Sequence, residues 1–463
     1  MPLFSRREGS LLTIKNIDTL VSCDPKVGVQ RNVDLCVDNE FIASITPTDG
    51  ISSQSGEQID GSNWLVFPGL INTHHHFFQS FFRNRSEFGW TGNVLDWIAT
   101  IYPAFAKLTE PCFYHTSMIA MLELIKYGCT TSFDHQYCFP KHAGKYLVDA
   151  QIQAAEELGM RFVAGRGANT LSMRDGGNVP DLMVESVQDF VDDVERLVNC
   201  YHEASPGAMV QIAVAPCQPI NCSAATFAQS AELAEAYDLR LHTHLGEGES
   251  QAVKHRYGMR SLDWLHDLGF ANSKLWIAHG WDLNTEEIND LADLGIGVSH
   301  CPIPMALVGE AVTDVEGMAA AGVRVSLGVD GSASSDASNL AEATRFAYLS
   351  QCSVVKSRNL PPPRPENYLH MATRNGALVM GREDLGSLTV GLAADLFAID
   401  KRRVEYACAV AEPEGLPARV GIGAGVDMTM INGRVVWRNG EFRSVDERTV
   451  IEAATKCMRA TLN

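Results

Sequence analysis

The chain has 463 residues, a length that favours a large catalytic domain with a smaller appended one. Hydrophobic residues make up 46% and charged residues 20% of it, which is ordinary globular usage and excludes a largely disordered chain. The formal net charge of -19 repels phosphate backbones, so nucleic acid is not expected as a partner.

The sequence carries no sign of membrane insertion or secretion. No run approaches the roughly 18 apolar residues of a membrane span, and the opening MPLFSRREGS lacks the apolar core of a signal peptide. The 12 cysteines are scattered without CxxC pairs, which favours reduced thiols in packing roles. We therefore expect a cytoplasmic protein without membrane contact and, on general grounds, a homodimer or higher homo-oligomer.

Both ends of the chain predict β-structure. Residues 1–67 contain the short alternating segments LLTIKNIDTLVS, DLCVDNEFIASI and WLVFPG. Residues 385–463 contain ADLFAID and VDMTMINGRVVWRNGEF, in which Asn432-Gly433 and Asn439-Gly440 are hairpin-turn signals. The two ends are predicted to build one small β-sandwich domain together.

Residues 68–384 alternate short apolar runs with longer amphipathic segments, which is typical of βαβ units and a parallel sheet. The apolar runs are VFPGLINTHHH, GCTTSFDH, RFVAGRG, VQIAVAP, LRLHTHL, LWIAHG, GIGVSHCP and VRVSLGVD. These eight runs predict an α/β fold, a (β/α)8 TIM-like barrel. A doubly wound sheet is the alternative, but no GxGxxG or Walker-type loop follows any of the runs.

Histidines and carboxylates gather at the predicted strand ends, where barrel enzymes place their chemistry. In INTHHHFFQ, His74 and His76 are two residues apart and share a face of an extended segment, whereas His75 points the other way. Two imidazoles on one face can share a cation. Alone, the pair is weak evidence, because a polar surface cluster has the same pattern.

The fifth predicted strand, LRLHTHLGEGE, adds a third imidazole and a carboxylate. His244 lies nearest the strand end, whereas His242 is expected to be a hydrogen-bonded residue of the barrel interior. Glu247 follows just past the strand, where it could reach a metal-bound water without being a ligand, as a proton shuttle must.

Two further strands end in His279 and Asp330. Each residue alone has an ordinary structural explanation, since Asp followed by Gly often only forms a turn. Residues of this kind on several strands of one barrel are hard to attribute to accident. Imidazoles with a carboxylate suit one divalent ion, zinc first and iron(II) second.

The motifs PGLINTHHHFFQ, HTHLGE, SHCP and GVDGSASSD, with the strand-end His279, resemble the amidohydrolase superfamily, specifically its nucleobase and triazine deaminase branch. The resemblance covers nearly the whole chain. It implies a single metal ion held by His74, His76, His244 and Asp330, without the carbamylated lysine of two-metal relatives.

The resemblance also implies a reaction. It predicts a hydrolytic aminohydrolase that acts on an amino- or alkylamino-substituted N-heterocycle, such as a hydroxy-s-triazine, and releases ammonia or an alkylamine. AHGW at 278–281 and CPIPMALVG at 301–309 depart from the purine enzymes and favour the triazine side. Alternatives are an 8-oxoguanine or related purine or pterin deaminase, and a ring-halide or cyclic-amide hydrolase. A non-enzymatic metal-binding protein would leave Glu247 without a purpose.

The expected catalytic groups are Glu247, His279 and Asp330. A divalent cation lowers the pKa of its bound water from 15.7 toward about 7. Asp330 is expected to accept the water proton, His279 to polarise the attacking oxygen, and Glu247 to protonate a ring nitrogen beside the attacked carbon.

Substrate contacts are expected from Gln79, Arg83, Trp90 and His279. Arg83 could instead pair with a carboxylate, and the aromatic residues that follow His76 could stack on a heterocycle or simply pack in the core. The remaining strand-end residues are expected to line the pocket or support the ligands: Asp134, His135, His300, Cys301, Ser332, Ser334, Ser335 and Asp336.

Overall fold

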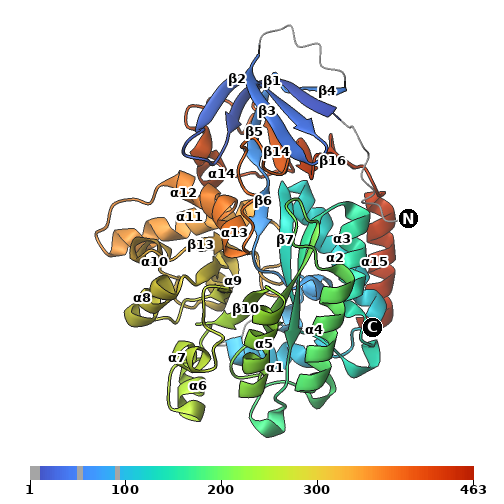
Figure 1. Cartoon of the computed structure of the whole chain (residues 1–463), viewed down its shortest axis with the longest axis vertical. Helices are drawn as coiled ribbons and strands as arrows, with labels where there is room; N and C mark the ends of the chain where they lie inside the picture. Colours follow the sequence, from blue (N-terminus) through green and yellow to red (C-terminus); the bar gives the residue numbers. More distant parts are fainter. Residues whose placement is uncertain (1–10, 49–55, 89–93, 463) are drawn as a thin grey trace.

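The computed structural model describes residues 11–48, 56–88 and 94–462. Figure 1 shows a large body of strands surrounded by helices, with a smaller sheet above it that combines the two ends of the chain. Among the described residues, no helix is both long and apolar enough to cross a bilayer.

The large body is a parallel barrel. Its eight strands pair in chain order, and they are β6 (Leu70–Asn72), β7 (Cys129–Gln136), β8 (Arg161–Ala168), β9 (Val210–Pro216), β10 (Arg240–Leu245), β11 (Leu275–His279), β12 (Gly297–His300) and β13 (Val325–Leu327). The first and last strands meet through the segments that follow them, because Thr73 N donates to Leu327 O and Asp330 N donates to His74 O, both at 3.1 Å. The predicted eight-stranded barrel is confirmed.

Helices cover the outside of this barrel. The larger ones are α2 (Glu110–Lys126), α3 (Leu147–Leu158), α4 (Val187–Tyr201), α5 (Ala224–Ala236), α8 (Thr285–Leu294) and α11 (Leu340–Ser357). In α4, the buried residues Phe190, Val194 and Leu197 follow helical spacing and form the face toward the strands. Ser186 caps that helix by accepting the N–H of Asp189 at 3.0 Å.

Further helices complete the cover: α1 (Val94–Phe105), α6 (Ser250–Tyr257), α7 (Ser261–Asp267), α9 (Pro302–Val308), α10 (Val315–Ala321), α12 (Pro365–Met371) and α13 (Arg374–Val379). Of these, α1 matters most for function, because it contributes side chains to the pocket described below.

The smaller body is one mixed sheet that joins the two ends of the chain. Its strands are β1 (Leu11–Val21), β2 (Val29–Asp38), β3 (Phe41–Pro47), β4 (Glu57–Asp60), β5 (Trp64–Pro68), β14 (Leu396–Asp400), β15 (Met428–Ile431), β16 (Arg434–Arg438) and β17 (Glu441–Phe442). Both predicted hairpin turns are present, since Asn432 and Asn439 have φ of 51° and 54° and are each followed by a positive-φ glycine. The last helix, α15 (Glu447–Leu462), leaves this sheet and packs against α2 of the barrel (Figure 1).

Candidate metal centre and active site

Three imidazoles and one carboxylate converge at the carboxyl ends of the barrel strands. His76 Nε2 lies 3.1 Å from His244 Nε2, and Asp330 Oδ1 lies 3.4 Å from His74 Nε2 and 3.2 Å from His76 Nε2. All four side chains are buried. His244 lies within β10 as expected, but β6 ends at Asn72, so the segment carrying His74 and His76 follows the strand rather than belonging to it.

The hydrogen bonds of two of these rings show which nitrogen carries the hydrogen. His76 Nδ1 lies 3.0 Å from the carbonyl of His135, and His244 Nδ1 lies 2.7 Å from the carbonyl of Cys217. A carbonyl oxygen can only accept, so both rings donate from Nδ1 and leave a lone pair on Nε2. These lone pairs point at each other across 3.1 Å, an arrangement that a shared cation would stabilise.

Burial favours the neutral form of three imidazoles at this site, those of His74, His244 and His279. It lowers the pKa of His74 and of His279 to about 3 and holds the pKa of His244 well below its usual value. Neutral imidazole nitrogens are the form that binds zinc or iron(II). The donor set therefore fits one divalent metal ion.

The backbone is held in an uncommon conformation at two of the strand-end residues. His279 has φ of 78° and Asp330 has φ of 64°, and both values fall in the left-handed region that few residues other than Gly adopt. Backbone of this kind persists where the surroundings impose it and is concentrated at functional sites.

Glu247 lies beside the convergent ligands. Its Oε1 is 3.3 Å from His279 Nε2. Burial, followed by the charges of Asp330 and Glu249, raises the pKa of Glu247 well above its usual value. A raised pKa favours the protonated form of a carboxyl group, which is the form that can act as an acid.

Glu249 holds the loop that carries Glu247. Its two carboxylate oxygens accept the backbone N–H groups of Gly246 at 3.0 Å and Glu247 at 2.7 Å. Because Glu249 is buried, water cannot replace these bonds. Glu249 was not among the site residues predicted from the sequence, although it ends the segment LGEGE that also carries Glu247.

A pocket opens onto these groups. Its wall combines aromatic, apolar and amide side chains, namely His76, Gln79, Trp97, Ile98, Tyr102, Tyr137, Cys217, Gln218, His244, Glu247, Asp330 and Ser334. Among the predicted substrate contacts, Gln79 is in this wall. Sequence reasoning missed Trp97, Ile98 and Tyr102 because they lie on α1, away from any strand end. Gln218 could have been found, since it closely follows β9.

Two other predicted substrate contacts, Arg83 and His279, are not among the residues of this wall. Arg83 is not part of the described pocket wall; it pairs with Glu123 at 2.7 Å and donates to Ser332 and Ser338. The structure therefore shows Arg83 paired with a carboxylate, which was the predicted alternative to a substrate contact. Trp90 lies outside the described residues.

The aromatic residues after His76 pack in the core. Phe77 stacks on Phe162 with ring centroids 5.7 Å apart, and Phe78 contacts Phe105 edge-on at 5.0 Å. Phe81 and Phe82 are also buried in this cluster. None of these four rings is among the residues that form the pocket wall.

Asp134 and His135 support the segment after β6. Asp134 accepts the N–H of Phe77 at 2.5 Å and an amide hydrogen of Gln151 at 2.8 Å, and burial raises its pKa to about 7. His135 contacts the carbonyl of Ala215 through Nε2 at 2.7 Å, and its own carbonyl is the acceptor for His76. Both residues therefore hold the segment that carries His76 through hydrogen bonds, Asp134 to the N–H of Phe77 and His135 to the ring of His76.

The polar loop after β13 is internally bonded. Ser334 lines the pocket and donates to Asp330 Oδ2 at 2.8 Å, whereas Ser335 donates to Gly331 O at 3.0 Å. Asp336 accepts the N–H of Asn84 at 2.6 Å. His300 and Cys301 are buried but lie outside the pocket wall.

Comparison with known proteins agrees with this geometry. The amidohydrolase family model matches residues 65–436, and the chain belongs to this family of hydrolases. It is 49% identical over 453 residues to hydroxydechloroatrazine ethylaminohydrolase of Pseudomonas sp. (strain ADP), covering 96% of this chain and 94% of that protein. It is 39% identical over 355 residues to 8-oxoguanine deaminase of Pseudomonas aeruginosa, covering 75% and 77% of the two chains.

The fold has solved relatives with bound zinc. The structure of atrazine chlorohydrolase from Arthrobacter aurescens TC1 complexed with zinc superposes with a TM-score of 0.90 at 29% identity, covering 96% of this chain and 100% of that one. The predicted superfamily, barrel fold and hydrolase class are confirmed.

Proposed function

We propose that this protein is a zinc-dependent aminohydrolase that removes an alkylamine from a hydroxy-s-triazine, with His74, His76, His244 and Asp330 as the metal ligands. The observation that carries the proposal is the placement of the buried Glu247, 3.3 Å from His279, beside paired imidazole lone pairs, in the wall of a pocket that also has aromatic and amide side chains. The 49% identity to hydroxydechloroatrazine ethylaminohydrolase supports the choice of substrate.

The chemistry divides among three side chains. A divalent ion at the convergent nitrogens supplies Lewis-acid activation of a water molecule. Asp330 accepts the proton of the attacking water, while Ser334 holds its Oδ2 in place. His279 orients the attacking oxygen, and Glu247 protonates a ring nitrogen beside the attacked carbon. Asp330 then passes the proton that it took from water to the amine, the C–N bond breaks and the amine leaves. The ring nitrogen keeps the proton from Glu247, and Glu247 regains a proton from the new hydroxyl group as that group becomes a carbonyl.

The pocket wall offers different surfaces to the N-alkyl group and to the ring edge of a flat heterocycle. Trp97 and Ile98 offer apolar surface for an N-alkyl group, whereas Gln79 and Gln218 offer amides for the ring edge. Gln218 is 2% exposed and its Oε1 has no partner among the described residues, so it is available to a substrate N–H.

The deciding experiment is a parallel turnover assay of the zinc-loaded protein on hydroxyatrazine, 8-oxoguanine, guanine and a pterin, with ammonia and alkylamine followed separately. We expect hydroxyatrazine to be the best substrate and alkylamine the released product. Dominant purine turnover without alkylamine would replace this proposal with 8-oxoguanine deamination, which the 39% identical relative supports. Atrazine is assayed in parallel with chloride as the readout, and chloride release would favour the chlorohydrolase chemistry named for the structural relative.

Three further expectations remain predictions. They are the domain limits of 1–67, 68–384 and 385–463, a cytoplasmic location, and a homodimeric or larger assembly. Analytical ultracentrifugation of the purified protein tests the last of these.

A further inference from the structure

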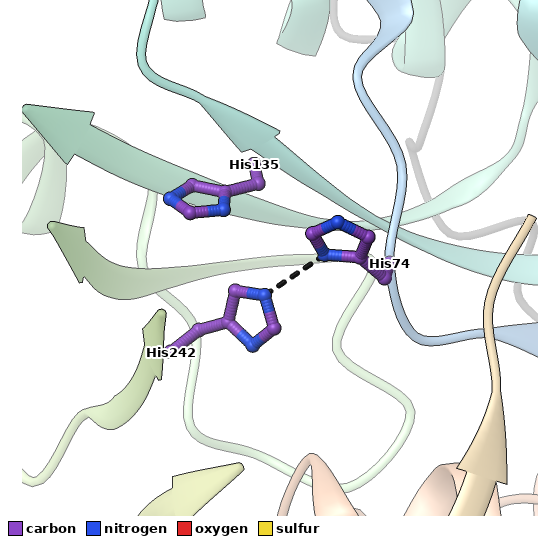
Figure 2. Close-up of side chains that lie close together, drawn as sticks. All are labelled: His74, His135 and His242. Atoms are coloured by element: carbon purple, nitrogen blue, oxygen red, sulfur yellow. Dashed lines mark hydrogen bonds between the residues drawn. The ribbon is translucent and has the colours of Figure 1, made fainter. Parts of the chain in front are cut away.

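Figure 2 shows three imidazoles that meet inside the barrel, those of His74, His135 and His242. One nitrogen of each lies within 4.8 Å of the others. Only His74 belongs to the proposed metal site, and His135 accepts the hydrogen bond of His76 through its carbonyl, so His242 needs a separate explanation.

The hydrogen bonds of His242 form a directed chain. His242 Nδ1 lies 2.9 Å from the carbonyl of Trp276, so Nδ1 carries the hydrogen of the neutral ring. Its Nε2 is then an acceptor, and it lies 2.9 Å from His74 Nδ1 (Figure 2). His74 must therefore donate from Nδ1, which leaves the lone pair of its Nε2 directed at Asp330.

The ring of His242 is held in this orientation by its neighbours. Phe133 contacts it edge-on and Trp276 lies against it, each with ring centroids 4.6 Å apart. The indole N–H of Trp276 also donates to the carbonyl of Thr73 at 3.0 Å, directly before His74. Trp276 thus fixes both ends of the contact between His242 and His74.

A second metal ion at this trio does not fit the same contacts. The hydrogen between His74 and His242 occupies the nitrogens of both rings that a cation would need, so among the three rings only His135, through Nδ1, has a nitrogen without a partner in the described residues. Binding there would require His74 to lose its one N–H hydrogen, the one on Nδ1. The trio is therefore better explained as a support for the proposed site.

We infer that His242 is a positioning residue that holds His74 in the form whose Nε2 can bind the metal. The other two imidazole ligands donate to main-chain carbonyls, so among the three only His74 depends on a replaceable side chain. Such supporting contacts typically change metal affinity by about 10- to 100-fold. The inference rests on the proposed metal site.

The test compares His242→Leu, which has no acceptor, with His242→Gln, whose amide oxygen can reach the position of the imidazole Nε2. Zinc affinity is measured by competition with a chromophoric chelator, and thermal unfolding of the metal-free proteins is measured alongside. We expect His242→Leu to bind zinc about 10- to 100-fold more weakly than wild type, and His242→Gln to stay near wild type. The loss in His242→Leu should exceed any change in metal-free melting temperature.

If His242→Leu fails to fold, His242→Asn takes its place, because its shorter amide keeps the contact with Trp276 but cannot reach His74. The inference is overturned if the variant without an acceptor binds zinc as tightly as wild type, or if His242→Gln loses as much affinity as that variant. A wild-type protein that binds no stoichiometric zinc would instead overturn the proposed metal site itself, so the two failures are distinguishable.

Discussion

His76 and His244 face each other through their Nε2 atoms at 3.1 Å, although each ring donates from Nδ1 to a backbone carbonyl. Two lone pairs at this distance repel each other unless a positive charge lies between them. The barrel therefore holds a strained arrangement that a bound cation relieves.

Metal removal should consequently destabilise the protein. A ligand present at about 100 times its Kd stabilises the folded state by roughly 2.7 kcal/mol, so we expect the melting temperature to fall by a few degrees after treatment with a chelator. Adding zinc should restore it, whereas magnesium, which prefers oxygen ligands, should not. An unchanged melting temperature in protein shown to be metal-free would contradict the assignment of these lone pairs.

The raised pKa of Glu247 predicts a pH dependence of the rate. Glu247 acts as an acid only while protonated, so kcat/KM should be high below its folded pKa and fall as the pH rises through it. Glu247→Gln should remove this limb and lower kcat by about 10²- to 10⁴-fold. Its zinc content should match that of wild type; a variant that retains full activity would exclude Glu247 as the acid.

Glu249 should affect turnover without contacting substrate. In Glu249→Gln, an amide nitrogen would face a backbone N–H of Gly246 or Glu247, leaving a buried donor unsatisfied at a cost of about 1–3 kcal/mol. We expect kcat to fall by about tenfold or more through displacement of Glu247, with zinc content unchanged. The exposed Glu286 provides a matched control, and Glu286→Gln should behave as wild type. Equal kinetics for both variants would rule out the positioning role.

Gly331 keeps the Gln79 side chain in the pocket wall. A Cβ at Gly331 would lie 1.9 Å from Gln79 Oε1, so Gly331→Ala must displace the flexible end of that side chain. We expect KM for the heterocycle to rise by about tenfold, with little loss of stability, because only the amide moves. Gly423→Ala is the control, since no atom lies within 4 Å of its added Cβ. An unchanged KM in Gly331→Ala would remove Gln79 from the proposed substrate contacts.

Much of the architecture could be predicted from the sequence. The strands that carry His244 and His279 are short apolar runs, because a parallel strand is buried on both of its faces. The amphipathic segments between such runs predicted the helices that cover the barrel. The Asn432-Gly433 and Asn439-Gly440 pairs predicted their hairpins because those turns need positive φ. The resemblance to the family predicted which residues act together as metal ligands. Side chains alternate between the two faces of an extended segment, and this alternation predicted that His74 and His76 share a face.

The tertiary structure decided the rest, because the remaining features depend on contacts between distant segments. Arg83 pairs with Glu123 on α2 instead of entering the pocket, and Trp97 enters it from α1. The tertiary structure also decides which nitrogen of His74 carries the hydrogen, because Nδ1 donates to His242, a residue 168 positions further along the chain. A sequence pattern identifies which side chains can bind a metal, but the donors and acceptors that the fold places behind them determine which nitrogen is free to do so.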